Sequence, residues 1–132
     1  MIGLDTNVLI RLFVDDPSNR AQVAVARRFV SQAKEPIRIS LVVVVEAVWT
    51  LRRQFGVRKA GLLQFLNLLL DDRRFQIESR AAIEDALDAY GRSSLDYADC
   101  LIERTNEAAG VSRTYTFDRA ACARRHFALL EA

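Results

Sequence analysis

Short apolar runs alternate along the chain with longer stretches in which apolar residues recur at helical spacing. Runs rich in β-branched and aromatic residues predict strands, and the i, i+3, i+4 stretches between them predict helices. The predicted strands are 1–4, 37–40, 74–77 and 113–116, with 127–130 as an optional last strand. The predicted helices are 6–13, 18–33, 58–71, 79–91, 95–109 and 118–126, with Ser18 as a cap and Gly56, Gly91 and Gly110 as helix-ending residues. Strands that alternate with helices predict a parallel sheet covered on both faces.

The segment from Ile37 to Val45 is rich in β-branched residues, which by itself favours one long strand. Glu46 follows and is the only polar residue in 41–49, so on a strand or a helix alike it begins next to the core. A lone ionised carboxylate in apolar surroundings is so costly that it shifts its pKa, pairs or binds a cation. A distant arginine could form a structural salt bridge with Glu46. No basic residue precedes Arg52 close by, however, and a functional role is the better interpretation.

Two further acids directly follow predicted strands. Asp5 comes after the apolar residues 1–4, and Asp118 comes after 113–116. Ligands of open α/β sheets bind outside the carboxyl ends of the strands, so both carboxylates are expected to face a site. Either could instead cap the helix predicted to follow it, a common role for aspartate.

Two more acids lie in the predicted helix 95–109. Asp99 falls at the edge of its apolar stripe, whereas Asp96 falls well outside the stripe. Asp96 also follows Ser93 by three residues, an approximate capping-box arrangement. Asp96 therefore has a structural explanation, and Asp99 is the better candidate for a site.

Together these residues resemble the signature of PIN-domain ribonucleases. The matching pieces are Asp5-Thr6-Asn7, Ser40 with Glu46 six residues later, Asp96-Tyr97-Ala98-Asp99 followed by Leu101-Ile102, and Thr116-Phe117-Asp118. They occur in the family's order over essentially the whole chain, which looks most like the VapC-type toxins of prokaryotic toxin–antitoxin pairs. The resemblance implies one domain, 1–132, with a PIN-like three-layer α/β/α fold around a central, mainly parallel sheet. It also implies a helix at 41–54 that begins just after Ser40, and we adopt this helix because tertiary context overrides propensity.

The resemblance further implies which residues form the site. The catalytic and metal-binding acids would be Asp5, Glu46, Asp99 and Asp118, of which Asp118 occupies the family's most variable position. Thr6, Asn7 and Thr116 would be supporting polar groups near the scissile phosphate, and Asp96 could hold a water in the outer coordination shell.

The residue types of this set favour metal chemistry. His126 is the only histidine, so a ribonuclease mechanism that uses two histidines is excluded. Hard oxygen ligands without thiolate or imidazole select Mg²⁺ or Mn²⁺ over Zn²⁺. A water activated by such a cation would hydrolyse a phosphodiester and leave a 3′-hydroxyl and a 5′-phosphate. We therefore expect a metal-dependent endoribonuclease, with the resemblance implying the toxin of a type II pair that cleaves cellular RNA to arrest growth.

The sequence leaves one alternative function open and disfavours another. A catalytically inactive PIN-like module that binds RNA or protein is the alternative, although the intact acids favour an enzyme. A receiver-like signalling domain would need a lysine at the end of its last strand. Lys34 and Lys59 are the only lysines, and neither lies near the predicted strand 113–116.

Charge and composition agree with an RNA substrate and predict a cytoplasmic protein. The formal charge is +2, from 19 basic and 17 acidic residues, and almost every base is arginine, which binds phosphate through two parallel hydrogen bonds. Solvated helix faces would explain many of these arginines equally well. No secretory signal or membrane-length apolar run is visible, and Cys100 and Cys122 lack metal-type spacing, so we expect free thiols in the cytoplasm.

Partners are predicted from one helix and from the resemblance. The helix at 58–71 is apolar over more than one face, which favours either burial or contact with a partner, such as a second copy in a homodimer. The resemblance to VapC toxins implies a small VapB-like antitoxin that covers the acidic pocket.

Overall fold

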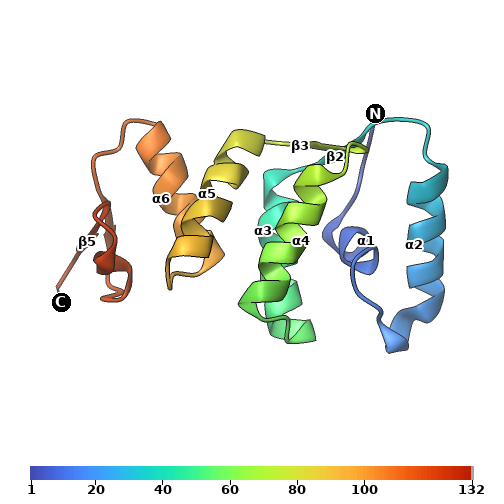
Figure 1. Cartoon of the computed structure of the whole chain (residues 1–132), viewed down its shortest axis with the longest axis horizontal. Coiled ribbons are helices and arrows are strands. Elements are labelled where there is room, and N and C mark those ends of the chain that lie inside the picture. Colours follow the sequence, from blue (N-terminus) through green and yellow to red (C-terminus); the bar gives the residue numbers. More distant parts are fainter. Residues whose placement is uncertain (132) are drawn as a thin grey trace. The chain divides into compact units, whose positions relative to one another are not determined.

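The computed structural model describes residues 1–131, which form two compact units, Met1–Glu78 and Ser79–Ala132. Each unit contains its own helices and parallel strands (Figure 1). The two units are described separately below. No helix within the described range is long and apolar enough to span a membrane.

The first unit is built on a sheet of three parallel strands. The strands are β1 (Ile2–Gly3), β2 (Ile37–Ile39) and β3 (Phe75–Ile77), in the order β1-β2-β3. The helices are α1 (Thr6–Arg11), the 3-10 turn η1 (Pro17–Asn19), α2 (Arg20–Gln32), α3 (Leu41–Phe55) and α4 (Lys59–Asp71). The register pairs Ile37 with both Ile2 and Phe75, so the carboxyl ends of all three strands lie at one edge of the sheet.

Helix α3 begins directly after Ser40, as the family resemblance implied, and the interpretation of 37–45 as one long strand is wrong. Two side chains satisfy the first amides of α3. The Val43 amide donates to Ser40 Oγ at 3.3 Å, and the Leu41 amide donates to Glu78 Oε1 at 3.1 Å. Of the valines that favour a strand by propensity, Val43 and Val44 lie on the buried face of this helix, while Val42 is exposed. Gly56 ends the helix in the left-handed conformation at φ 63°.

Helix α4 uses most of its apolar residues in the core of the first unit. Its buried residues are Leu62, Phe65, Leu66, Leu69 and Leu70. Leu68 is 50% exposed. Burial therefore explains most of the apolar pattern that suggested a second copy, and the homodimer stays a prediction.

The second unit contains two packed helices and a pair of strands. They are α5 (Arg80–Arg92), α6 (Tyr97–Ala108), β4 (Thr114–Thr116), the 3-10 turn η2 (Ala121–Ala123) and β5 (Phe127–Leu129). Tyr97 joins α6 to α5, because its hydroxyl donates to the Ile83 carbonyl at 3.4 Å and its ring meets Tyr90 edge-on at 5.7 Å. β4 and β5 pair in parallel, with Thr114 opposite Phe127.

Three local predictions are wrong. The segment 118–126 contains only the 3-10 turn η2 and not an α-helix, because the chain must return to the start of β4 to add β5 in parallel. Ser18 is not a cap. The Asp16 carboxylate accepts from the Ser18 amide at 3.1 Å and starts η1 instead. Gly91 lies inside α5, which ends at Ser93.

Candidate functional site

Asp5 stands at the carboxyl end of β1 and is exposed. Its backbone is extended, and its Oδ1 accepts a hydrogen bond from the Thr6 amide at 2.7 Å as the N-cap of α1. The helix-cap interpretation of Asp5 is therefore confirmed, and because the side chain remains exposed, its role in a site stays a prediction.

Thr6 links the β1–α1 junction to α3. Its side chain is buried, and its Oγ1 donates to Glu46 Oε1 at 2.9 Å. Glu46 itself is exposed, because α3 buries a different face, and the expectation that it begins next to the core is wrong. The Glu46 carboxylate is open to solvent and accepts the Thr6 hydrogen bond. The consequence for the site is that Glu46 is held beside the residue that follows Asp5.

A hollow of about 540 Å³ lies beside this junction. Asp5 and Asn7 line one side of it, and the other side is α2, including Val25 and Phe29. Arg11 also lines the hollow, and its Nη1 donates to the Asn7 carbonyl at 2.7 Å. The supporting residue Asn7 thus lies on the same surface as Asp5.

In the second unit, α6 begins at Asp96, which is the N-cap residue. The helix thus begins three residues later than a capping box with Ser93 as the N-cap residue requires. Ser93 Oγ accepts from the Leu95 amide at 3.4 Å and lies 3.6 Å from Cys100 Sγ, so Ser93 organises the turn before the helix. Asp96 is exposed, and Asp99 in the first helical turn is half-buried.

Asp99 lies among like charges. Burial is the main cause that raises the pKa of its carboxyl group, and the negative charges of Asp96 and Asp118 raise that pKa further. Asp118 follows β4, where its amide donates to Thr116 Oγ1 at 3.0 Å and its Oδ1 accepts from the Ala120 amide at 2.9 Å. The second unit therefore brings Asp96 and Asp118 within electrostatic range of Asp99, with Thr116 shaping the turn before Asp118.

The donor set suits a hard divalent cation. All candidate ligands are carboxylate oxygens, and mutual repulsion of the kind felt by Asp99 is what a cation relieves. No group of three or more His, Cys, Asp or Glu side chains arranged to hold a metal was found within residues 1–131. In the first unit, Thr6 contacts both Asp5 and Glu46. In the second unit, Asp96 and Asp118 act electrostatically on Asp99, and Thr116 contacts the Asp118 amide.

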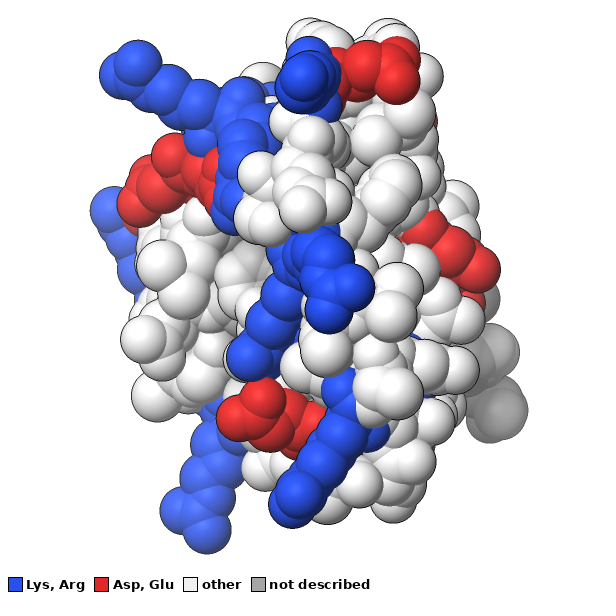
Figure 2. Space-filling view, turned by 90° about the vertical axis from the view of Figure 1, so that its right-hand side faces the viewer, with Lys and Arg blue, Asp and Glu red and all other residues white. Residues whose placement is uncertain are grey.

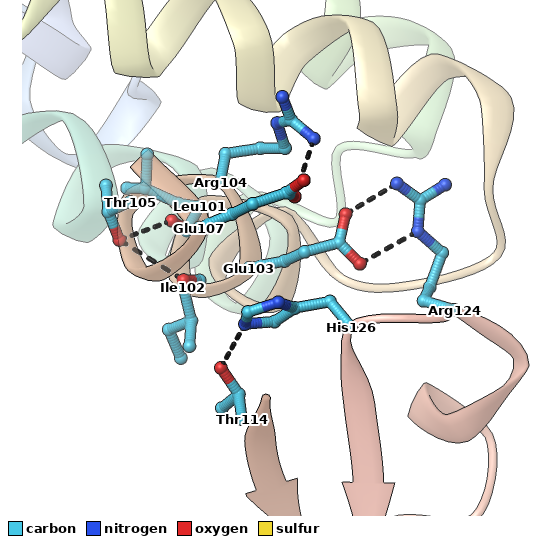
Figure 3. Close-up of polar contacts among 9 residues, drawn as sticks. All are labelled: Leu101, Ile102, Glu103, Arg104, Thr105, Glu107, Thr114, Arg124 and His126. Carbon is cyan, nitrogen blue, oxygen red and sulfur yellow. Dashed lines mark hydrogen bonds and ion pairs between the residues drawn. The ribbon is translucent and has the colours of Figure 1, made fainter. Parts of the chain in front are cut away.

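A polar cluster on α6 was not predicted from the sequence (Figure 3). Glu103 is only 2% exposed, and both its oxygens accept from Arg124, from Nη2 at 2.5 Å and from Nε at 3.0 Å. This fork lowers the pKa of Glu103. His126 is buried, and its Nε2 lies 2.5 Å from Thr114 Oγ1. Glu103 lies one helical turn after Asp99, but its partner is 21 residues away, so local patterns carried little signal of the pair.

Basic side chains run along the face of the molecule on which α2 lies (Figure 2). Helix α2 contributes three exposed arginines, Arg20, Arg27 and Arg28, and contains no acid. Arg27 pairs with Asp15 at 3.1 Å, while Arg20 and Arg28 form no ion pair with any described residue. This helix therefore presents uncompensated positive charge beside the hollow that Asp5 and Asn7 line.

Comparisons with known proteins assign the chain to a family. The family described as PIN domain matches residues 2–126. A VapC ribonuclease from Aquifex aeolicus (strain VF5) is 22% identical over 116 residues, which cover 88% of this chain and 86% of that protein. Among solved structures, the sarcin-ricin loop cleaving toxin VapC20 of Mycobacterium tuberculosis aligns over 93% of this chain and 94% of its own, with 19% identity and a TM-score of 0.47. The family match and the parallel pairing of the described strands confirm the expected PIN-like α/β fold.

Proposed function

Because the chain belongs to the PIN domain family, we propose that it is an endoribonuclease that uses Mg²⁺ or Mn²⁺ to hydrolyse RNA. Similarity to a VapC ribonuclease over 88% of the chain supports the reaction class. The geometric observation that carries the proposal is the hydrogen bond from Thr6 to Glu46, which holds the acid of α3 against the residue that follows Asp5.

Asp5, Glu46, Asp99 and Asp118 are the proposed catalytic acids and would hold the cation. A bound divalent cation would lower the pKa of the attacking water and neutralise charge that develops on the phosphorane. The chain's own residues keep the carboxylates in place. Thr6 fixes Glu46 through its hydroxyl group, and the Thr6 amide fixes one oxygen of Asp5. Thr116 accepts from the Asp118 amide and sets the turn that presents Asp118.

The RNA backbone is proposed to bind along the basic face of α2. Arg20 and Arg28 have no acidic partner among the described residues, so their guanidinium groups are available to phosphates. Attack by water breaks the bond between phosphorus and the 3′-oxygen, and the products carry a 3′-hydroxyl and a 5′-phosphate. This reaction does not use the 2′-hydroxyl.

The direct test is to incubate the purified protein with total cellular RNA in the presence of Mn²⁺ or of EDTA and to sequence the new 5′ ends. We expect 5′-phosphate ends that appear only with the metal and that are absent for Asp5→Asn. Asp71→Asn, which changes an exposed acid of α4 outside the proposed set, should cleave like the parent. Cleavage that persists in EDTA, or an active Asp5→Asn variant, would contradict the proposal.

The toxin role is a separate part of the proposal, supported by the similarity to a VapC ribonuclease. We propose that a VapB-like antitoxin, encoded next to this chain, binds it and blocks the acids. Expression of the chain alone should then slow growth of its host, and co-expression with the neighbouring small gene should restore growth. A harmless effect of the active protein in its own host would remove the toxin role and leave the nuclease role in place.

A further inference from the structure

Glu103 and Arg124 form an ion pair in which the carboxylate is almost fully buried, and the proposed catalytic roles do not use it. The side chain of Glu103 is 3% exposed and that of Arg124 is 29% exposed, whereas Arg104 and Glu107 on the same helix form a pair with 34% and 53% exposure. A carboxylate this deeply buried destabilises the fold unless its partner and its hydrogen bonds are complete. The Arg124 fork satisfies both oxygens of Glu103 (Figure 3).

The pair connects two segments that each carry a proposed catalytic acid. Glu103 lies one turn after Asp99 on α6, and Arg124 lies directly after η2, in the connection that Asp118 begins. The connection, residues 118–126, has little regular structure of its own. Short turns hold it, from the Ala120 amide to Asp118 Oδ1 and from the Arg124 amide to the Ala121 carbonyl.

A second contact joins α6 to β4, at the end of the strand away from Asp118. Asn106, near the end of α6, donates to Thr114 Oγ1 at 2.9 Å, and Thr114 begins β4. Asp99, near the start of α6, feels the charge of Asp118, which follows the end of β4. Helix and strand therefore run in opposite directions, with Asn106–Thr114 at one end, Asp99 and Asp118 at the other, and Glu103–Arg124 closing the connection between them.

The end of this arrangement that carries the acids is the unfavourable one. Asp99 and Asp118 are both carboxylates, and among the described residues no hydrogen bond or ion pair joins their side chains. We propose that the Glu103–Arg124 ion pair is a positioning device, which holds the connection 118–126 against α6 and so keeps Asp118 close to Asp99 for a shared divalent cation. This inference rests on the proposed function for its purpose, while the tie itself is a property of the metal-free chain.

Variants can separate positioning from general stability. Arg124→Gln leaves Glu103 as an unpaired buried charge and could unfold the unit, so the main test uses the double variant Glu103→Met/Arg124→Met. Methionine fills irregular space, and the double change leaves no buried charge. Arg124→Lys keeps the charge but loses the two-pronged contact and should fall between the double variant and the parent. The matched control is Arg104→Met, which removes the exposed pair with Glu107 on the same helix.

The first measurement is amide hydrogen exchange of the metal-free proteins in EDTA. In the double variant, exchange across 118–126 should rise by about tenfold, the change expected when a local opening loses one strong contact. The amides of α2 and α3 should keep their parent rates, and Arg104→Met should match the parent throughout. Unchanged exchange across 118–126 in the double variant would overturn the tie.

The second measurement is Mn²⁺ affinity, from the electron paramagnetic resonance signal of free Mn²⁺, which does not depend on RNA cleavage. The dissociation constant for Mn²⁺ should rise by about tenfold in the double variant, because part of the binding free energy is then used to bring the two carboxylates together. A merely structural role would lower the melting temperature without changing the affinity of the folded protein. An unchanged dissociation constant, or a parent that binds no Mn²⁺, would overturn the inference. A parent that binds Mn²⁺ but cleaves no RNA would overturn the proposed function alone.

Discussion

The two units of the chain hold their acids in different ways. In Met1–Glu78, both proposed catalytic carboxylates accept a hydrogen bond from the same residue, Asp5 from the Thr6 amide and Glu46 from the Thr6 hydroxyl. In Ser79–Ala132, Asp99 accepts no hydrogen bond from any described residue. Burial and the negative charges of Asp96 and Asp118 raise the pKa of its carboxyl group. The acids of the first unit are therefore held by hydrogen bonds from Thr6, whereas in the second unit Asp96 and Asp118 act on Asp99 as like charges.

This difference shows which contacts of each unit stabilise the fold and which ones act against it. The Thr6 contacts belong to a helix cap and to a buried side chain, so the fold of the first unit maintains them in any case. The second unit places a half-buried carboxylate beside two like charges and offsets the repulsion with the Glu103–Arg124 pair. Mutations should consequently separate activity from stability in opposite ways in the two units.

The largest effect is expected for Asp5→Asn. The amide keeps the shape of the side chain and caps a helix about as well as aspartate, so α1 should stay intact. Loss of one negative ligand should lower RNA cleavage by several orders of magnitude, because the cation loses a charged donor. Cleavage assays with Mn²⁺, together with thermal melts, check this, with Asp71→Asn as the control. Parent-like cleavage by Asp5→Asn would remove Asp5 from the site.

The second effect separates the two acids at the start of α6. Asp99→Asn should abolish Mn²⁺-dependent cleavage, because Asp99 is the half-buried acid that lies within reach of the charge of Asp118. Asp96→Asn should retain part of the activity and lose some stability, because an exposed acid at a helix start favours the dipole by about 0.3–1 kcal/mol. Paired activity and melting measurements on both variants decide the assignment. The reverse ranking would make Asp96 the ligand.

A smaller effect is expected from Thr6→Val, which removes the hydroxyl group and keeps the volume. Glu46 is exposed, so water replaces the lost hydrogen bond at little cost in stability. The carboxylate is then free to rotate, and cleavage should fall by about tenfold, as expected for loss of one hydrogen bond to a charged group. Thr50→Val, on the same helix as Glu46, is the control. Equal cleavage by Thr6→Val and the parent would show that the Thr6 contact does not position Glu46.

The sequence predicted best those features that depend on chain order and short-range chemistry. The strands at 37–40, 74–77 and 113–116 and the acids that follow strand ends were found because turn residues and apolar runs mark them locally. The start of α3 was the instructive exception. Its valines favour a strand, and the Glu78 carboxylate, far away in sequence, helps to cap the helix that forms.

The features that sequence could not supply depend on distant partners. The segment 118–126 has residues that suit a helix, yet the parallel pairing of β5 with β4 and the contact of Arg124 with Glu103 leave room only for η2. Likewise the apolar residues Ala98 and Ile102 of α6 are exposed, while the acid Glu103 is buried. A buried acid is invisible to periodicity because its place in the core depends on a base elsewhere in the chain.

The smallest expected effect is on the melting temperature of the metal-free protein, and it contrasts the two units directly. A folded-state pKa above the unfolded value means that the folded chain binds the Asp99 proton more tightly, so stability falls as pH rises from about 3.9 through the raised value. Asp99→Asn removes this penalty and should melt slightly higher than the parent at pH 7, and the difference should shrink as the pH approaches 4 in EDTA. Asp85→Asn, an exposed acid on α5, should show no such pH-dependent gain. In the first unit, Asp5→Asn should not raise the melting temperature at any pH in this range, because it removes a carboxylate that the Thr6 amide stabilises. If Asp99→Asn melts at or below the parent temperature at pH 7, the acids of the second unit do not oppose one another, and the contrast between the units disappears.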